Sequence, residues 1–395
     1  MPGFFKGQTT KTKTPKLPQC GKCGLYKNCI SPKMEVTGSG TRKVLFVAEA
    51  PGEQEDRLGT QLIGEPGQLL RSTLEDIDVD IEDCSKTNSV ICRPSSNKIE
   101  PYMISCCRPN LLQSISRIKP NVIVVLGKSA LESLMFKEWK KDLGTIGRWV
   151  GWTIPSGQYN AWLCPTHHPS YLLKMHEDQQ LMRIFKTHLK QAFKYESRPV
   201  KNYSLDKLRS QVEIITDPKQ GGLRMKELLK KKGVLAFDYE TNGLKPDTPE
   251  HKIVSCSFCL NGKDTFATMI DESNQLVLSR ILRQSNLKKV ASNLKFEERW
   301  TRAMFGHGVR GWVWDTMLAS HCLDNRSHIT SIKFQAFIHL GIPDYDSSIY
   351  PYLRSGSSNG INRIEQADKK ELLMYNGLDS LLEYLVAKRQ RKQFK

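Results

Sequence analysis

The sequence predicts an α/β protein with two domains, and three observations carry this prediction. Its 395 residues exceed the usual size of a single domain. In the first half, short apolar segments alternate with segments of helical character, which is typical of a doubly wound parallel sheet with helices on both faces. Residues 196–211 are polar and contain proline, so we expect a linker there and a second domain at residues 212–395.

The strands expected in the first half are short and apolar. Residues 44–48 form a run with β-branched residues that stops before Pro51 and Gly52, because proline lacks a backbone N–H and glycine suits unusual backbone angles. Runs of this length are typical of strands buried on both faces. The other expected elements are strands near residues 87–91, 121–127 and 161–164, and helices near residues 67–76 and 102–118.

Polar residues stand at the ends of these expected strands. Glu49, Asn88 and His168 each lie at or near such an end. In an open α/β sheet, ligands bind beyond the carboxyl ends of the strands, so the three side chains could meet in one cleft. Taken singly, Asn88 is typical of a turn and His168 of a loop, and the case for a site depends on their meeting.

The net charge of the chain indicates which kind of partner it binds. A formal charge of +18 and an isoelectric point near 9.4 indicate a polyanionic partner, either nucleic acid or an anionic membrane. No apolar stretch approaches the ~18 residues needed to cross a bilayer, and the first residues lack the apolar core of a signal peptide. We therefore expect a cytoplasmic protein without a membrane partner, with a disordered basic arm at residues 1–19.

Three separated segments of the first half resemble the iron–sulfur uracil-DNA glycosylases of family 4. They are AEAPGEQEDRLGTQLIGEPGQLL at residues 48–70, TNSVICRP at 87–94 and HHPSYLL at 167–173. Their order and spacing fit that family across residues 20–195. The resemblance implies that the first domain removes uracil from DNA.

The resemblance also implies a role for each matching residue. Asn88 would pair with the Watson–Crick edge of a base flipped out of the stack, and His168 would donate to the developing anion at O2 of that base. Glu49 would orient water or stabilise the sugar cation. Gly52 and Leu62 would contact the substrate, although the family usually has an aromatic residue in place of Leu62. That difference weakens the stacking beneath the flipped base. Two alternatives therefore stay open: the domain excises a different base, or it has lost its activity and only binds DNA.

Eleven cysteines in a large chain without a secretion signal favour metal ligation over a disulfide framework. Cys20 and Cys23 form a C-x2-C pair, and Cys92 and Cys107 lie where the family has its remaining cluster ligands. The resemblance therefore implies a [4Fe–4S] cluster, with a tetrahedral zinc ion as the alternative. Cys106 stands beside Cys107 and is the alternative fourth ligand.

Pairs of polar residues in the second half are spaced so that they share one face. Asp238 and Glu240 follow a buried-type apolar run two residues apart, so they point to the same side of a strand. Tyr375 and Asp379 are four residues apart and share one helical face. A carboxylate pair at the exit of a buried strand favours a site for a divalent metal ion.

The segments DYET, NLKFE and YNGLD resemble the three motifs of the 3′–5′ proofreading exonuclease of family-A DNA polymerases, in its viral (phage) form, across residues 212–390. The resemblance implies an RNase H-like fold and degradation of DNA from 3′ ends. The chain is then either a free-standing fusion of two enzymes or the front part of a viral polymerase. A separate DNA polymerase subunit is a candidate partner.

The same resemblance implies two Mg²⁺ or Mn²⁺ ions. Asp238, Glu240 and Asp379 would hold one ion, and Asp238 with Glu297 would contact the second. Tyr375 would position the attacking water. Glu297 departs from the family, which more often has aspartate there, and its longer arm could loosen the second ion.

Overall fold

The structure of the protein is a computed structural model that describes residues 17–176, 178–201 and 203–394. The chain divides into two compact units between residues 200 and 201, with residues 138–140 grouped with the second unit. The expected basic arm lies outside the described residues except for residues 17–19. Within the described part of the chain, no helix is both long enough and apolar enough to span a bilayer.

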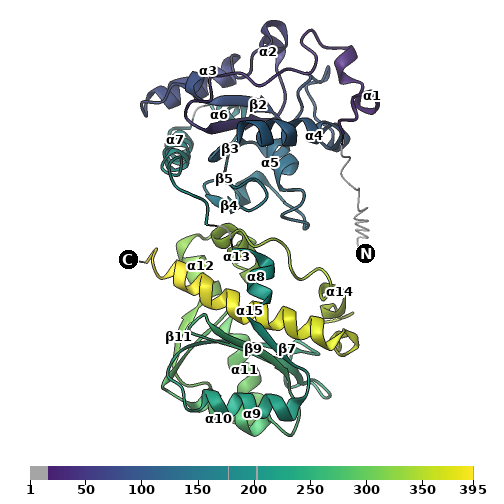
Figure 1. Ribbon diagram of the computed structural model, residues 1–395, viewed down its shortest axis with the longest axis vertical. Coiled ribbons are helices and arrows are strands. Elements are labelled where there is room, and N and C mark those ends of the chain that lie inside the picture. The colour runs from purple at the N-terminus through teal and green to yellow at the C-terminus, as the bar shows by residue number, and fades with distance from the viewer. Residues whose placement is uncertain (1–16, 177, 202, 395) are drawn as a thin grey trace. The chain divides into compact units, whose positions relative to one another are not determined.

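The first unit contains a five-stranded sheet (Figure 1). Its strands, in spatial order, are β2 (Ser85–Asn88), β1 (Val44–Ala48), β3 (Val122–Leu126), β5 (Ala161–Thr166) and β4 (Ile154–Ser156). The first four run parallel, and β4 pairs antiparallel with β5 at the edge. This arrangement confirms the predicted doubly wound parallel sheet and adds an edge strand that was not predicted.

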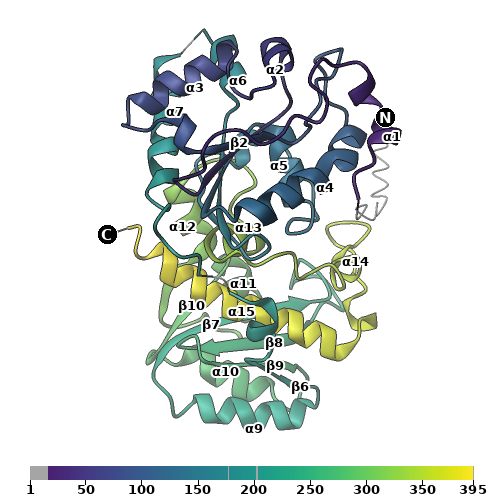
Figure 2. The same ribbon diagram turned by 45° about the horizontal axis from the view of Figure 1, so that its top comes forward.

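Helices cover both faces of this sheet (Figure 2). They are α2 (Glu53–Leu58), α3 (Glu65–Glu75), α4 (Pro101–Ile118), α5 (Lys128–Met135), α6 (Pro169–Lys174) and α7 (Gln179–Phe193), and the short α1 (Cys20–Cys23) precedes them. Val44, Phe46 and Ala48, on one side of β1, belong to a core cluster with residues of α3 and α7. Helices α4 and α5 contact the sheet from the other side.

Strand β2 differs from its predicted bounds. The prediction placed a strand at residues 87–91, whereas β2 begins at Ser85 and ends at Asn88. All four of its residues are polar and all are buried. Lys86 is tolerated there because its ammonium group donates to Oε2 of Glu82 at 2.5 Å. A buried strand of polar residues lacks the apolar run by which strands are recognised in a sequence.

The second unit contains a six-stranded mixed sheet (Figure 1). Its strands, in spatial order, are β11 (Trp312–Asp315), β10 (Leu287–Ala291), β7 (Gly233–Thr241), β8 (Ile253–Leu260), β9 (Asp264–Met269) and β6 (Val212–Ile215). Strands β11, β10 and β7 run parallel, β8 is antiparallel to β7 and β9, and β6 is parallel to β9. This mixed α/β architecture agrees with the predicted RNase H-like fold.

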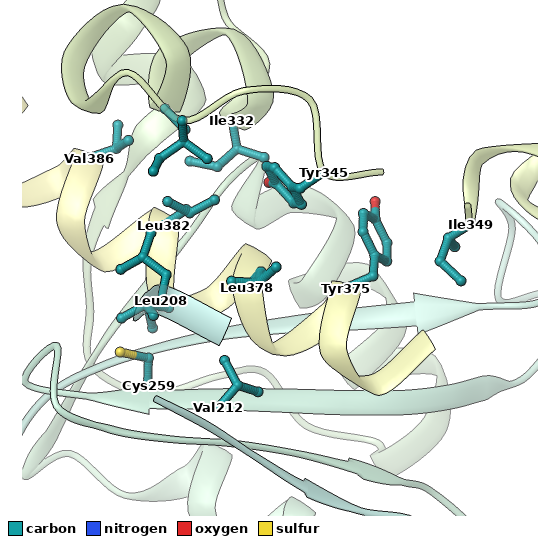
Figure 3. Packing of buried hydrophobic residues seen from close by; sticks show 14 of the residues in the cluster. Leu208, Val212, Cys259, Ile332, Tyr345, Ile349, Tyr375, Leu378, Leu382 and Val386 are labelled. Atoms are coloured by element: carbon teal, nitrogen blue, oxygen red, sulfur yellow. The ribbon is translucent and has the colours of Figure 1, made fainter. Parts of the chain in front are cut away.

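Two groups of helices cover the second sheet. Helices α9 (Pro218–Leu228), α10 (Gln275–Arg283) and α11 (Leu294–Phe305) share one core cluster with it. On the other face lie α15 (Lys369–Gln390), α13 (Ile332–Leu340) and the short α8 (Leu205–Arg209), with α12 (Thr316–Leu323) and α14 (Tyr350–Leu353) nearby. Figure 3 shows Leu378 and Leu382 of α15 above Val212 and Cys259 of the sheet. Helix α8 lies within residues 196–211, where a linker was expected. It packs against the second unit through Leu208, which is buried in this core.

A glycine lets α15 lie close to the sheet. Gly377 stands in the middle of the helix, where glycine is about 1 kcal/mol less favourable than alanine. A Cβ at this position would lie 2.3 Å from Cγ1 of Val212 on β6. The close approach requires glycine, and it brings the polar residues of α15 down to the level of the strands.

Candidate active sites

Three residues expected at the first site lie at one edge of the first sheet. Asn88 ends β2 beside Ala48 of β1, Glu49 follows β1, and His168 follows β5 as the N-cap of α6. Burial lowers the pKa of His168, and the negative charge of Glu49 raises it in part, so these two groups interact. Strand β3 separates β1 from β5, so Glu49 and His168 lie on either side of the end of β3.

A glycine at the end of β3 makes room for the Glu49 side chain. Gly127 has a φ of +89°, and a Cβ there would lie 2.7 Å from Oε1 of Glu49. The N–H of Ser129 donates to the same oxygen at 3.1 Å. The Glu49 carboxylate thus lies across the end of β3, in space that a side chain at position 127 would occupy.

If Glu49 acts in base removal, as the resemblance implies, Gly127→Ala should lower base release by about 100-fold, because the new Cβ displaces the Glu49 carboxylate. Alanine also strains the backbone at this φ. Base release from single strands by the full-length protein measures the effect. Gly147→Ala is the matched control, since its Cβ would meet nothing nearer than 3.7 Å. Parental base release by a folded Gly127→Ala protein would contradict this account of Glu49.

Hydrogen bonds determine the tautomer of His168. The N–H of Ser170 donates to Nδ1 at 3.2 Å, and the Ser170 hydroxyl lies 2.8 Å from the same nitrogen. Because Nδ1 accepts, the neutral ring carries its proton on Nε2. Burial lowers the pKa of His168, which favours the neutral ring. The ring can therefore donate one hydrogen bond from Nε2 without carrying a charge.

The side chain of Asn88 contains an unsatisfied donor. Asn88 is 2% exposed, and its Nδ2 has no hydrogen-bond partner. Leaving a buried polar group unpaired costs about 1–3 kcal/mol, so such groups are rare unless they have a task. The free amide at a sheet edge fits the recognition of a polar ligand.

The loop between β1 and α3 contains the other two residues expected to contact substrate. Gly52 is the N-cap of α2, where a Cβ would lie 2.6 Å from Oε2 of Glu55. The Glu55 carboxylate accepts from the N–H groups of Ile63 and Gly64 at 3.1 and 2.9 Å, so it holds this loop together. Leu62 has a φ of +58° and is buried in the core. Sequence analysis missed Glu55, because its role depends on the path of the loop.

Five cysteines line one pocket of the first unit. Cys20 and Cys23 come from α1, Cys92 from the loop after β2, and Cys106 and Cys107 from α4. A tetrahedral zinc ion with Zn–S bonds of ~2.3 Å would hold its sulfurs about 3.8 Å apart. In the part of the chain that the structure describes, no three cysteine sulfurs lie within 4.8 Å of one another. Cysteines from three parts of the fold thus lie together where they could hold a metal centre.

Hydrogen bonds distinguish Cys107 from Cys106. The Cys107 sulfur accepts from the N–H of Ile91 at 3.4 Å and from the amide of Asn110 at 3.6 Å. The Cys106 thiol instead donates to Oε1 of Gln19 at 4.0 Å. Hydrogen bonds to sulfur are one means by which proteins tune cluster thiolates. This pattern favours Cys107 over Cys106 as a ligand.

Three carboxylates meet in the second unit. Asp238 and Glu240 of β7 and Asp379 of α15 each offer an oxygen, and these oxygens all lie within 4.8 Å of one another. Burial, followed by the charge of Asp379, raises the pKa of Asp238 to about 8. Burial and then Asp238 raise the pKa of Glu240. Oxygen ligands of this kind suit Mg²⁺ or Mn²⁺, and a bound cation would offset the repulsion among them.

Two residues outside the expected motifs also contact Asp379. Lys333 of α13 donates to Oδ2 of Asp379 at 2.7 Å and to the Tyr375 hydroxyl at 2.9 Å. The Tyr345 hydroxyl donates to Oδ1 of Asp379. Burial lowers the pKa of Lys333, but the charge of Asp379, the hydrogen bond to it and the charges of Glu240 and Asp238 together raise that pKa, so the lysine stays charged. No spacing in the sequence could have linked Lys333 or Tyr345 to Asp379.

Glu297 completes the set expected at this site. It stands in the first turn of α11 and is 2% exposed. Burial raises its pKa, and the charge of Asp238 raises it further, so the two carboxylates interact. Asn376, which was not predicted, donates from Nδ2 to Oδ2 of Asp238 at 2.8 Å. The structure thus brings together Asp238, Glu240, Glu297, Tyr375 and Asp379.

Comparison with known proteins matches each half of the chain to a family. Residues 36–195 match the family model of the uracil DNA glycosylase superfamily. The type-4 uracil-DNA glycosylase of Saccharolobus solfataricus is 36% identical over 163 residues, which cover 39% of this chain and 73% of that protein. The enzyme of the same type from Thermotoga maritima is 35% identical over 177 residues, which cover 43% of this chain and 85% of that protein. The chain belongs to the type-4 uracil-DNA glycosylase family.

The similarity to type-4 uracil-DNA glycosylases covers the first half, and another family matches the second. Residues 212–342 match the family model of a 3′–5′ exonuclease. The DNA polymerase of Bacillus phage SP01 is 23% identical over 369 residues, which cover 84% of this chain and 38% of that polymerase. These findings confirm the prediction of an enzyme that joins a glycosylase domain to a 3′–5′ exonuclease domain and processes DNA.

Proposed function

We propose that the first half excises uracil from DNA and that the second half degrades DNA from its 3′ end. The strongest support for the first activity is the neutral Nε2 donor of His168 at the same sheet edge as the unpaired amide of Asn88. Uracil presents a carbonyl, an N–H and a second carbonyl along one edge. An amide and a neutral imidazole can match that pattern.

Each polar residue of the glycosylase site has a proposed task. The Asn88 amide donates to O4 of the base and accepts from its N3–H. His168 donates from Nε2 to O2, where negative charge grows as the bond between base and sugar breaks. Glu49 orients the attacking water or stabilises the sugar cation. Gly52 allows the backbone to approach the substrate closely.

A lapsed glycosylase that only binds DNA is the second candidate function. Leu62 favours it, because this residue is buried in the core and offers no aromatic face to an extruded base. Stacking contributes ~1–3 kcal/mol per base, so its loss changes the rate or the preferred base. Asn88 and His168 retain the groups needed for base recognition, and we therefore favour an enzyme.

In the nuclease half, we assign metal binding to four carboxylates. Asp238, Glu240 and Asp379 would hold one Mg²⁺ or Mn²⁺, and Asp238 with Glu297 would hold a second. When bound, the two ions stabilise negative charge on the attacking and leaving oxygens of the phosphodiester. The Tyr375 hydroxyl holds the attacking water by a hydrogen bond.

We further propose that Cys20, Cys23, Cys92 and Cys107 bind a [4Fe–4S] cluster that joins α1 and the loop after β2 to α4. Anaerobically purified protein should be brown and contain about four iron atoms per chain. Cys92→Ser should lower both the iron content and the melting temperature, because a ligand that anchors the loop is lost. Iron analysis and thermal melting measure these effects, with exposed Cys322 replaced by serine as the control. Colourless, folded protein with one zinc ion would refute the cluster.

One assay separates the two activities. Single strands containing uracil should lose the base in EDTA, because the proposed excision needs no divalent ion. Shortening from the 3′ end should stop in EDTA and resume when Mn²⁺ is added in excess. Nuclease activity without base release would identify the first half as a binding module, and the absence of both activities would overturn the proposal.

The similarity to a phage DNA polymerase supports a setting in viral DNA replication. A family-A polymerase would then act with this chain, either in the same polypeptide or as a separate subunit. Removal of uracil and of mispaired 3′ ends would serve the same newly made strand.

A further inference from the structure

The nuclease site contains a further buried acid that none of its motifs includes. Glu383 lies on α15 one helical turn after Asp379 and is 1% exposed. Its Oε1 accepts the N–H of Ser292 at 3.1 Å. Ser292 follows β10, and the register of β10 with β7 places it level with Asp238. Glu383 therefore approaches Asp238 from the side of β10.

Two carboxylate oxygens near Asp238 have no hydrogen-bond partner. They are Oε2 of Glu383 and Oε2 of Glu297, both on residues that are at least 98% buried. A buried unpaired carboxylate costs several kcal/mol unless an opposite charge compensates it. Two of them beside one aspartate indicate a site that a cation balances.

Lys333 does not supply this balance. It donates to Asp379 and to Tyr375, on the side of the site formed by Asp379 and Glu240. The free oxygens of Glu297 and Glu383 therefore need another partner.

We propose that Glu383, together with Glu297 and Asp238, holds the second divalent cation of the nuclease. The inference rests on the proposed nuclease function and extends it, because the motifs assign this ion only Asp238 and Glu297. Asp379 and Glu383 would serve the two ions from successive turns of α15, with Asp238 shared between them. A third carboxylate also compensates for the longer, looser arm of Glu297.

Glu383→Gln tests this assignment with little change of shape. The amide keeps an acceptor for the N–H of Ser292 and removes only the charge. Glu371→Gln, at an exposed position in the first turn of the same helix, is the matched control. Mn²⁺ is titrated into each full-length protein, and electron paramagnetic resonance measures the free ion. The parental and control proteins should bind two ions at the carboxylates. Glu383→Gln should bind the first as before and the second at least about tenfold more weakly.

The possible outcomes separate this inference from the function on which it rests. Equal affinity for both ions in the Glu383→Gln and parental proteins would overturn the inference alone. Mn²⁺ binding that Asp238→Ala leaves unchanged would overturn the nuclease site as well. If circular dichroism shows Glu383→Gln to be unfolded, Glu383→Asp takes its place, because it keeps the charge and retracts it by one methylene. This variant should weaken the second ion alone, and unchanged affinity for both ions would again overturn the inference.

Discussion

Asp238→Ala is expected to slow 3′–5′ degradation of DNA by about a thousandfold or more. Asp238 is shared by both proposed ions, so the change withdraws a carboxylate from each. The loss of several kcal/mol of transition-state stabilisation corresponds to a rate effect of about this size. Single-turnover shortening of a 5′-labelled strand in Mn²⁺ measures it. Asp206→Ala is the matched control, because that carboxylate is 92% exposed.

Base release gives an internal control for the same variant. It should remain at the parental rate in Asp238→Ala protein, since the glycosylase residues belong to the other unit of the chain. Loss of both activities would point to misfolding. Degradation of 3′ ends at the parental rate would show that β7 does not carry the metal site.

Asn88→Ala is expected to reduce uracil excision by at least about 100-fold and to abolish the preference for uracil over cytosine. A site built to pair with a polar edge discriminates strongly, because wrong partners leave buried groups unpaired. Rates of base release from strands containing either base measure the effect, with Asn28→Ala, at an exposed position, as the control. Undiminished selectivity would refute the role of Asn88.

The structure gives a reason to expect that this variant folds. Nδ2 of Asn88 has no partner within the protein, so removing it breaks no hydrogen bond of that atom. The melting temperature and the 3′–5′ nuclease rate should therefore stay close to the parental values. If the melting temperature, the nuclease rate and the rate of uracil excision all fell, Asn88 would support the fold instead of reading the base.

The strands with apolar sequences could be predicted, and the polar or very short ones could not. All five residues of β1 and all five of β3 are buried, so both strands appear in the sequence as apolar runs. Strand β2 is equally buried but polar, and the partner that makes Lys86 acceptable is known only from the fold. Strand β4 has three residues, one of them Pro155, and is too short to show a period.

The candidate sites likewise contain some residues that could be predicted from the sequence and others that could not. The pair Asp238 and Glu240 could be predicted because two residues of separation is a property of any strand. Gly127 and Glu55 could not, since one matters through a positive φ and the other through the N–H groups of a loop. Lys333 reaches Asp379 across 46 positions of the sequence, and only the packing of α13 on α15 brings them together.

Helix α15 also determines which changes of length the nuclease can accept. Tyr375, Asp379 and Glu383 recur every four residues, so they stand in a row with steps of about 6 Å along the helix axis. One inserted residue between the first two would turn every later side chain by about 100° and carry the two acids out of the site. We therefore expect insertions and deletions in this helix to harm the nuclease far more than substitutions on its outer side.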